Sequence, residues 1–259
     1  MNKPNYGNWI PTPLLRTLGG VSAGLGGLWL ASWFLLKDRV ISAAALILFL
    51  AGLAMTAYMT VCHRAFSFEG KNVMGRIHRF LLTKLPWDGH GRLLDIGCGS
   101  GSGSILCAKT WPDADITGID YWGKGWNYAK EQCEQNAALE GTDRIHFLRG
   151  DAAELPFQTG EFDAAVSNFV FHEVKSQPDK RLVVREALRV IRPGGYFAFH
   201  DLFEHREIYG DMEEFVTQLK EEGITEIHYE AHTERLEFSP WYCKAPWLLS
   251  GLGVLYGRR

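Results

Sequence analysis

A glycine-rich turn between two acidic residues carries the clearest chemistry in this sequence. A short apolar segment that contains Asp95 leads into Gly97, Gly99 and Gly101, and a second apolar segment ends at Asp120. Because glycine has no Cβ and adopts positive φ readily, such a turn lets backbone N–H groups approach a ligand closely. An acid about twenty residues beyond the glycines is the usual partner of ribose hydroxyls in βαβ units. The pattern therefore predicts a site for a nucleotide-type cofactor.

The spacing of these glycines argues against two familiar phosphate-binding loops. A dinucleotide fingerprint needs glycine at its first, third and sixth positions, but the sixth is Ser102 counted from Gly97 and Ser104 counted from Gly99. A P-loop needs a lysine directly after its last glycine, and the first lysine beyond the turn is Lys109. Neither strict pattern is present.

The turn instead resembles the first motif of the class I S-adenosylmethionine-dependent methyltransferases, which reads as an acid, one residue and Gly-x-Gly-x-Gly. Later motifs of that family are resembled in order by segments 145–152, 162–168 and 188–197. The resemblance covers roughly residues 92–259. It implies S-adenosyl-L-methionine as cofactor and a Rossmann-like α/β fold, with a doubly wound, mostly parallel seven-stranded sheet and helices on both faces.

The order of the expected elements agrees with such a sheet. Strands are predicted at 92–96, 115–120, 145–149, 162–167 and 196–199, and helices at 102–110, 125–140 and 180–191. Alternation of this kind predicts parallel strands covered by helices on both faces. A helical pattern over 204–222 then precedes two last strands at 224–230 and 252–256, of which the final one is antiparallel in relatives.

Ligands bind outside the carboxyl ends of the strands in such sheets, which places Asp95, Asp120, Asp151 and Asn168 on one rim. By resemblance, Gly97, Gly99 and Gly101 let the backbone approach the methionyl part of the cofactor, and Asp95 holds its ammonium group. Asp120 would accept hydrogen bonds from both ribose hydroxyls, for which a carboxylate has two oxygens.

The same resemblance assigns the residues around the adenine. Tyr121 or Trp122 would lie on the ring. Asp151 would accept a hydrogen bond from the exocyclic amino group, and the backbone N–H of Ala152 would donate one to the ring. Each assignment has a plainer alternative, since Asp120 could cap the next helix and Tyr121 could belong to the core.

Methyl transfer from a sulfonium is an in-line displacement, which chiefly requires alignment of the reacting atoms. A neutral nucleophile must also lose a proton, so a general base can assist. Asn168, after the fourth predicted strand, is expected beside the methyl-transfer site, and His172 is a candidate base because its ordinary pKa is near neutrality. A structural or cofactor-lining role for His172 is the alternative, and Glu173 is expected to face solvent or cap a helix.

The first quarter of the chain is of a different kind. Residues 18–36 and 40–61 contain no charge and are separated only by Lys37-Asp38-Arg39. Runs of about twenty apolar residues can span a bilayer as helices, so the pattern predicts a transmembrane helical hairpin. A signal peptide, a hairpin buried in an oligomer and a hairpin lying in the membrane interface are the alternatives. We expect residues 1–64 to form the tail and hairpin, 65–90 an amphipathic connecting helix, and 91–259 the methyltransferase domain.

Small residues on the first apolar run predict close packing of its helix. Gly20 and Gly24 form a GxxxG pair, which Gly19, Ala23 and Gly27 extend, and the second run offers Ala44, Ala51 and Gly52. Self-association of these helices is left open. Positive residues favour the cytoplasmic side, and they gather after the second run, so both chain ends and the main domain are expected in the cytoplasm.

Composition limits the remaining choices. A net charge of −3 and a pI near 6.3 give no electrostatic footprint for nucleic acid, and the five cysteines lack the spacing of a disulfide framework or zinc cluster. His228 and His232 fall on a predicted strand, where their spacing does not pair them, so no metal site is expected. The aromatic stretch around Trp241 and Trp247 is read as core, as pocket wall or as a surface resting on lipid.

A membrane-anchored methyltransferase with a small or lipophilic acceptor is the function that these features predict. The acceptor atom, whether O, N, S or C, is left open. The alternatives are a membrane-tethered protein that binds S-adenosylmethionine without catalysis and an NAD(P)-dependent oxidoreductase. Ser102 and the Asp151-Ala152 pair argue against the oxidoreductase.

Overall fold

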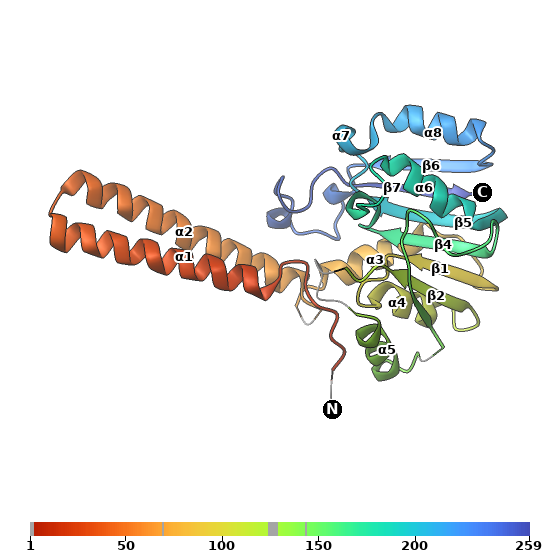
Figure 1. Ribbon diagram of the computed structural model, residues 1–259, viewed down its shortest axis with the longest axis horizontal. Helices are drawn as coiled ribbons and strands as arrows, with labels where there is room; N and C mark the ends of the chain where they lie inside the picture. The colour runs from red at the N-terminus through yellow and green to blue at the C-terminus, as the bar shows by residue number, and fades with distance from the viewer. Residues whose placement is uncertain (1–2, 69, 124–128, 143) are drawn as a thin grey trace. The chain divides into compact units, whose positions relative to one another are not determined.

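The protein is described by a computed structural model that covers residues 3–68, 70–123, 129–142 and 144–259. The chain divides into two compact units (Figure 1). One unit is Gly7–Met74, and the other comprises Met1–Tyr6 and Gly75–Arg259.

The first unit is a hairpin of two long helices. Helix α1 (Thr12–Ala31) continues into a short π-helical segment (Ser32–Leu36), and helix α2 (Arg39–Phe66) returns alongside it. The turn between them needs Lys37 at a φ of 55°, and the carboxylate of Asp38 then caps α2 by accepting the N–H groups of Val40 and Ile41. This cap satisfies backbone donors that a helix start otherwise leaves unpaired.

The contact between α1 and α2 lies on a different face from the one that the GxxxG pair predicted. A Cβ at Gly20 or Gly24 would meet nothing within 4 Å, whereas one at Gly26 would lie 3.0 Å from the ring of Phe49. The buried Ser22 hydroxyl lies 3.0 Å from that of Thr56 on α2. Bulky Phe49 and the hydroxyl pair thus set the rotation of α1, and the prediction for the small-residue face of Gly19, Gly20, Ala23, Gly24 and Gly27 was wrong.

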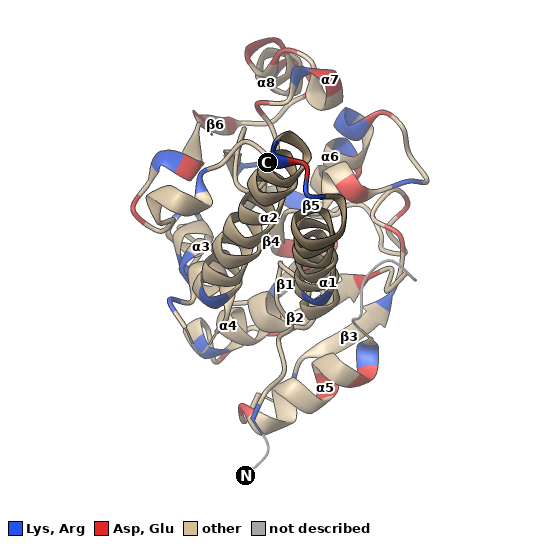
Figure 2. Cartoon of the chain, turned by 90° about the vertical axis from the view of Figure 1, so that its left-hand side faces the viewer, with Lys and Arg blue, Asp and Glu red and all other residues tan. Residues whose placement is uncertain are grey.

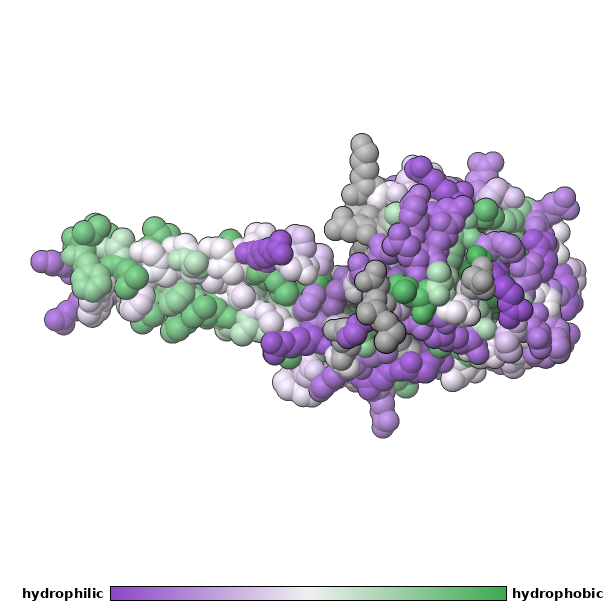
Figure 3. Space-filling view, turned by 90° about the horizontal axis from the view of Figure 1, so that it is seen from below, coloured by the Kyte–Doolittle hydropathy of each residue, from purple (hydrophilic) through white to green (hydrophobic). Residues whose placement is uncertain are grey.

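Both hairpin helices are long and apolar enough to cross a membrane, judged by length and composition. Their most apolar windows are only 17% and 6% buried inside the structure, so most of their apolar side chains are exposed. Figure 3 shows hydrophobic residues along the hairpin surface, and Figure 2 shows few charged residues on its helices.

The second unit is built on a seven-stranded mixed sheet with the order β3-β2-β1-β4-β5-β7-β6. Neighbouring strands from β3 to β5 are parallel, and β7 is antiparallel to both β5 and β6, as predicted for the last strand. The strands are β1 (Arg92–Ile96), β2 (Asp115–Asp120), β3 (His146–Arg149), β4 (Phe162–Asn168), β5 (Ile191–Asp201), β6 (Glu226–Ala231) and β7 (Gly253–Arg258).

The α-helices of this unit cover both faces of the sheet (Figure 1). They are α3 (Val73–Thr83), α4 (Ser102–Thr110), α5 (Lys130–Leu139), α6 (Lys180–Arg189), α7 (Arg206–Tyr209) and α8 (Met212–Glu221). The start predicted for the helix at 125–140 lies outside the described residues, and α5 is described from Lys130. The prediction for 204–222 corresponds to two helices, since Gly210 at positive φ ends α7.

Strand β5 begins at Ile191, earlier than the predicted residue 196, and the helix before it ends correspondingly earlier. Ile191 pairs with Phe162 on β4, and a bulge then shifts the register before Tyr196 pairs with Ala164. Pro193 and Gly194 therefore lie within an irregular strand. From the local sequence alone, these two residues predict a turn that ends one element and begins the next.

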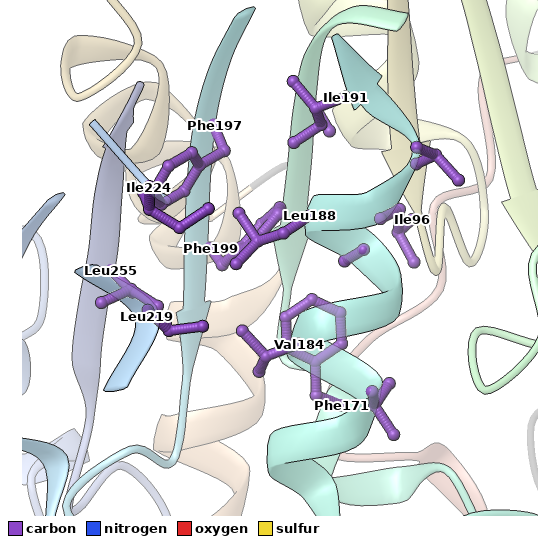
Figure 4. Packing of buried hydrophobic residues seen from close by; sticks show 14 of the residues in the cluster. Ile96, Phe171, Val184, Leu188, Ile191, Phe197, Phe199, Leu219, Ile224 and Leu255 are labelled. Atoms are coloured by element: carbon purple, nitrogen blue, oxygen red, sulfur yellow. The ribbon is translucent and has the colours of Figure 1, made fainter. Parts of the chain in front are cut away.

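Two apolar clusters hold the helices on the sheet. One lies under α6 and α8 and includes Phe197, Phe199, Val184, Leu188 and Leu219, which Figure 4 shows packed together. The other lies under α3, α4 and α5 and includes Leu81, Ile105 and Cys133. Complete burial of side chains of this size contributes about 1.5–3 kcal/mol each, so both faces hold the strand ends firmly in place.

Candidate functional site

The sheet order places the predicted polar residues in one row. Strands β3, β2, β1 and β4 are neighbours, and Asp151, Asp120, Asp95 and Asn168 lie at or directly after the carboxyl ends of these strands in that order. The rim is thus formed by side chains from four segments that are far apart in sequence.

The glycine turn between β1 and α4 has the backbone conformation that its glycines predict. Gly97, Gly99 and Gly101 have φ values of 74°, 56° and 82°. A Cβ at Gly97 would lie 2.1 Å from the side chain of Val170, so only glycine fits there. The amide of Asn136 on α5 supports the turn from behind by donating to the carbonyl of Ser100 at 2.9 Å.

Asp120 links the end of β2 to the glycine turn. One carboxylate oxygen accepts the N–H of Gly99 at 2.9 Å, and the other accepts the N–H of Trp122 at 2.8 Å. A carboxylate has about four acceptor sites, so each oxygen keeps room for a further donor. The arrangement can accept the two hydroxyls of a vicinal diol while the carboxylate stays fixed.

Asp95 is a buried carboxylate below the same turn. It is 5% exposed and accepts the hydroxyl of Ser104 at 2.6 Å. Burial raises its pKa to about 6, although the hydrogen bond from Ser104 lowers it. Such a group favours a cation in its neighbourhood, because a positive charge would offset the cost of burying the negative one.

Two aromatic residues follow Asp120 and take different positions. The indole N–H of Trp122 donates to the carbonyl of Gly99 at 2.9 Å, so this side chain lies against the glycine turn. Tyr121 is 59% exposed, and the guanidinium of Arg149 lies 5.5 Å from its ring centre. The exposed ring of Tyr121 is the one with a face open to a planar ligand.

The segment after β3 forms a tight turn. The side chain of Asp151 accepts the N–H of Ala153 at 2.9 Å, and Ala152 packs partly against the core. The N–H of the preceding Gly150 donates to the carbonyl of Asp120, which ties this turn to the end of β2.

Asn168 is held by a buried histidine that sequence reasoning missed. Nδ1 of His200 on β5 lies 3.0 Å from Oδ1 of Asn168, and its Nε2 lies 2.7 Å from the hydroxyl of Thr233. Burial lowers the pKa of His200 to about 3, so the ring is neutral. Nδ1 therefore donates to Asn168 while Nε2 accepts from Thr233. In the described part of the chain, the amide nitrogen of Asn168 donates to no acceptor and stays available.

His172 lies beside β4 with both ring nitrogens near carboxylates. Nδ1 is 2.6 Å from Asp201 and Nε2 is 3.5 Å from Glu173. Burial lowers the pKa of His172, but the carboxylates of Asp201 and Glu173 together outweigh burial and raise this pKa to about 9. The imidazole is thus charged at neutral pH, which does not suit a proton acceptor. Asp201 also accepts the N–H groups of Val170 and Phe171, so the pair holds the segment after β4 in place.

A small cavity of about 30 Å³ adjoins the rim, with room for one or two water molecules. Asp95, Gly97 and Asn168 line it together with His78, Leu81 and Leu82 of α3. Sequence reasoning treated His78 only as one of several basic residues. Its position on the same helical face as Leu81 and Leu82 was the available signal, because a polar residue on an apolar face calls for a reason.

The residues present fit the cofactor that the motif implies. Gly97 leaves no space for a side chain, Asp120 keeps acceptor sites for a diol, and Asp95 is a buried carboxylate that a cation would stabilise. The exposed ring of Tyr121 lies next in sequence to Asp120. A ligand made of an amino acid linked to a nucleoside offers a matching group to each of them. Its ammonium group suits Asp95, its ribose diol suits Asp120, and its flat base suits the ring of Tyr121.

Comparisons with known proteins agree with this geometry. Residues 94–199 match the family described as a methyltransferase domain. A fatty-acid O-methyltransferase of Mycolicibacterium smegmatis is 36% identical over 110 residues, which are 42% of this chain and 36% of that protein. A phthiotriol/phenolphthiotriol dimycocerosates methyltransferase of Mycobacterium tuberculosis is 35% identical over 120 residues, 46% of this chain and 41% of that protein.

A third relative, the 27-O-demethylrifamycin SV methyltransferase of Amycolatopsis mediterranei, is 36% identical over 121 residues, which are 47% of this chain and 42% of that protein. The chain thus spans about two fifths of the length of the curated relatives it matches. The segment that matches the methyltransferase domain family, residues 94–199, contains the glycine turn and the rim residues Asp95, Asp120, Asp151 and Asn168.

Solved structures share the fold at low sequence identity. A geranyl diphosphate methyltransferase in complex with GPP and sinefungin has a TM-score of 0.52 at 15% identity, covering 71% of this chain and 77% of that one. The [4+2]-cyclase SpnF has a TM-score of 0.50 at 24% identity, covering 64% and 63%. One name is that of a methyltransferase and the other of a cyclase, so the fold alone does not decide the reaction.

The family match and the three curated relatives go further than the fold, because all of them are named for methyl transfer. Residues 94–199 therefore match a methyltransferase domain in sequence, and the glycine turn and the rim lie within this segment.

Proposed function

We propose that the protein is a membrane-attached methyltransferase that uses S-adenosyl-L-methionine to methylate a small, lipophilic acceptor. The row of Asp151, Asp120, Asp95 and Asn168 around the glycine turn carries this proposal. When bound, the cofactor supplies an electrophilic methyl group. The chain's own residues then have to bind the two substrates, align them and keep water away.

The proposed contacts of the cofactor follow the row. Asp95 attracts the ammonium group, and the backbone of Gly97, Gly99 and Gly101 makes room for the methionyl part. Asp120 accepts the ribose hydroxyls with the acceptor sites that Gly99 and Trp122 leave open.

Around the adenine, Tyr121 stacks on the base, Asp151 accepts from its amino group, and the backbone N–H of Ala152 donates to the ring. The exposure of Tyr121 supports its part in this arrangement. Asn168, held by His200, presents its free amide nitrogen at the methyl-transfer site.

A lipophilic acceptor is supported by an aromatic cluster beside Asn168. The rings of Phe169 and Phe80 lie 4.7 Å and 6.0 Å from that of His200, and Phe238 lies 5.3 Å from Phe80. Such rings bind apolar groups and exclude water. The names of the relatives point the same way, since a fatty acid, a dimycocerosate and a rifamycin derivative appear in them.

Attachment to a membrane is supported by the exposed apolar surface of the hairpin. In water, contiguous apolar surface of this size is unfavourable, whereas a bilayer core of about 30 Å accommodates it. We propose that residues 18–61 cross the membrane twice with the turn at Lys37 outside, and that the methyltransferase domain faces the cytoplasm, because basic residues follow α2.

Radiolabelled methyl transfer tests the activity. The full chain in lipid nanodiscs is incubated with methyl-labelled S-adenosylmethionine and a total lipid extract, and label in the organic phase is counted. We expect time-dependent label with the wild type and with the control Asp113→Ala, and a loss with Asp120→Ala, because Asp113 is an exposed carboxylate away from the rim. Cofactor binding without any transfer would favour the non-catalytic alternative.

A labelling experiment tests the topology. Lys37→Cys is expected to react with a membrane-impermeant maleimide on intact cells, whereas His146→Cys in the catalytic domain is expected to react only after the membrane is opened. The described native cysteines are all buried and give little background. Release of the protein from membranes by alkaline carbonate would contradict the hairpin as a membrane span.

A further inference from the structure

His78 on α3 lines the small cavity that adjoins Asn168 and the glycine turn. Gly97 and Asn168 line this cavity of about 30 Å³ together with His78. Its remaining walls include apolar Leu81, Leu82, Leu106 and Val166. A histidine therefore borders a small, mostly apolar space beside the turn that is proposed to hold the methyl donor.

The ring of His78 is not used by the rest of the protein. Within the described residues, no hydrogen bond or ion pair engages it. The other two histidines near the rim are fully engaged, His200 with Asn168 and Thr233, and His172 with two carboxylates. A partly buried histidine without a protein partner keeps a lone pair for a ligand.

The protonation state of His78 suits a proton acceptor. Burial, together with the neighbouring charge of Arg79, lowers its pKa from 6.5 to about 4. His78 also interacts electrostatically with His200 on β5, which is neutral, and Asp95 of β1, Cys98 and Cys107 line the same cavity as His78. The ring is thus neutral at physiological pH.

The other titratable groups that line this cavity are less suited to the task. Burial raises the pKa of the Cys98 and Cys107 thiols well above their ordinary values, so both keep their protons. Asp95 already accepts the hydroxyl of Ser104 and is proposed to attract the ammonium group of the cofactor. His78 alone among these described groups combines a free lone pair with the neutral form.

We propose that His78 is the general base of the methyl transfer and that the acceptor is a lipophilic molecule with a reactive hydroxyl group. The inference rests on the proposed methyltransferase function. As the reaction proceeds, the acceptor O–H bond breaks and its proton goes to a ring nitrogen of His78. The acceptor oxygen bonds to the methyl carbon while the S–CH₃ bond breaks and its electron pair stays on sulfur, which leaves as a neutral thioether.

The charges of this step balance within the site. A positive charge disappears at sulfur and appears on the imidazolium of His78, so the net charge of a water-poor site stays constant. The carboxylate of Asp95 lines the same cavity and attracts the new charge. Moving a charge between groups that already face each other costs less than creating one in an apolar space.

The presence of a base favours a hydroxyl acceptor over a carboxylate. A carboxylic acid is ionised at neutral pH and attacks without a proton acceptor, whereas an alcohol or phenol needs one. The aromatic cluster of Phe80, Phe169 and Phe238 is suited to the apolar body of such a molecule. Phe80 belongs to the same helix as His78, and its ring lies 6.0 Å from that of His200, which holds Asn168 at the cavity.

Kinetics of His78→Gln, with His146→Gln as the matched control, tests the role of the base. His146 is exposed and is the first residue of β3, so it lies at the end of the strand away from the rim. With a lipid extract as acceptor, we expect kcat of His78→Gln to fall about 10²- to 10⁴-fold while the calorimetric Kd for S-adenosylmethionine stays within a factor of three. Added imidazole is expected to restore activity to His78→Ala, which a purely structural role would not allow.

A second readout needs no cofactor. NMR of the protein labelled with ¹⁵N at its nine histidines reports the charge of each ring. The signal of His78 is identified as the one that is lost in His78→Gln, and we expect it to have the chemical shifts of a neutral ring at pH 7. A charged ring at pH 7 would overturn the proposal, as would a kcat of His78→Gln within threefold of the wild type.

The product identifies the acceptor group. Mild alkali cleaves methyl esters but leaves methyl ethers intact, so we expect the label in the lipid product to resist it. Release of the label as methanol would mean a carboxylate acceptor and would overturn this inference while leaving the methyltransferase function standing. Absence of any transfer by the wild type would instead overturn the proposed function, and the role of His78 with it.

Discussion

The buried carboxylate of Asp95 makes a prediction that couples stability to cofactor binding. In the folded protein its pKa is raised from 3.8 to about 6, chiefly by burial. At about 1.4 kcal/mol per pKa unit, ionised Asp95 lowers the free energy of unfolding by about 3 kcal/mol above pH 6. Asp95→Asn removes this cost and keeps an oxygen that can accept the Ser104 hydroxyl.

The sign of the pH dependence follows from the direction of the shift. Between pH 4 and pH 6 the native state of the wild type binds more protons at Asp95 than the unfolded state, so stability falls as pH rises through this window. The variant lacks this fall. We therefore expect the stability advantage of Asp95→Asn over the wild type to be larger at pH 7.5 than at pH 4 by about 2.4 kcal/mol, and Asp113→Asn at an exposed site to show no such difference.

Guanidinium unfolding of the full chain in detergent, followed by tryptophan fluorescence at several pH values, measures these differences. Calorimetry measures the effect on cofactor binding. Because Asp95→Asn loses the charge that attracts the ammonium group, we expect its Kd for S-adenosylmethionine to rise by about tenfold or more. The reasoning is refuted if the stability difference between Asp95→Asn and wild type does not change from pH 4 to pH 7.5. Unchanged cofactor affinity would refute the assigned contact.

Three further substitutions test other parts of the site. Gly97→Ala is expected to destabilise the domain by at least about 2 kcal/mol, because it combines a positive φ with a steric clash; denaturant midpoints measure this, and a neutral effect would contradict it. The His172–Asp201 pair is expected to stabilise the fold fully below pH 6.5 and to lose this contribution as pH rises through about 9, so His172→Gln should flatten the alkaline part of the stability profile. Thr233→Val should cost about 1–3 kcal/mol in thermal unfolding because it leaves Nε2 of buried His200 unpaired, whereas an unchanged melting temperature would contradict the network.

The parts of the fold and site that could be predicted depend on local sequence. The glycine turn and Asp120 were readable because a strand, three glycines and an acid follow one another at short spacing. The helix at 102–110 and the strands at 92–96 and 115–120 have the predicted bounds, because apolar runs and turn residues delimit them. The antiparallel last strand came from the family resemblance and is confirmed.

Other features depend on contacts between distant segments and could not be read locally. Strand β5 extends back to Ile191 because it pairs with Phe162 across a bulge. Asn168 and His200 are neighbours only because their strands align in register. The rotation of α1 was predicted wrongly because Phe49 on the other helix decides which glycine is approached.

The central claim is that the rim around Asp120 binds the methyl donor. Calorimetric titration of the full chain in detergent with S-adenosylmethionine tests it most directly, with NAD⁺ as the competing ligand and Asp120→Ala beside the control Asp113→Ala. We predict one binding site for S-adenosylmethionine in the wild type and in Asp113→Ala, affinity at least tenfold weaker in Asp120→Ala from the lost ribose hydrogen bonds, and no binding of NAD⁺. Equal affinity in Asp120→Ala, or binding of NAD⁺ in place of S-adenosylmethionine, would contradict the account.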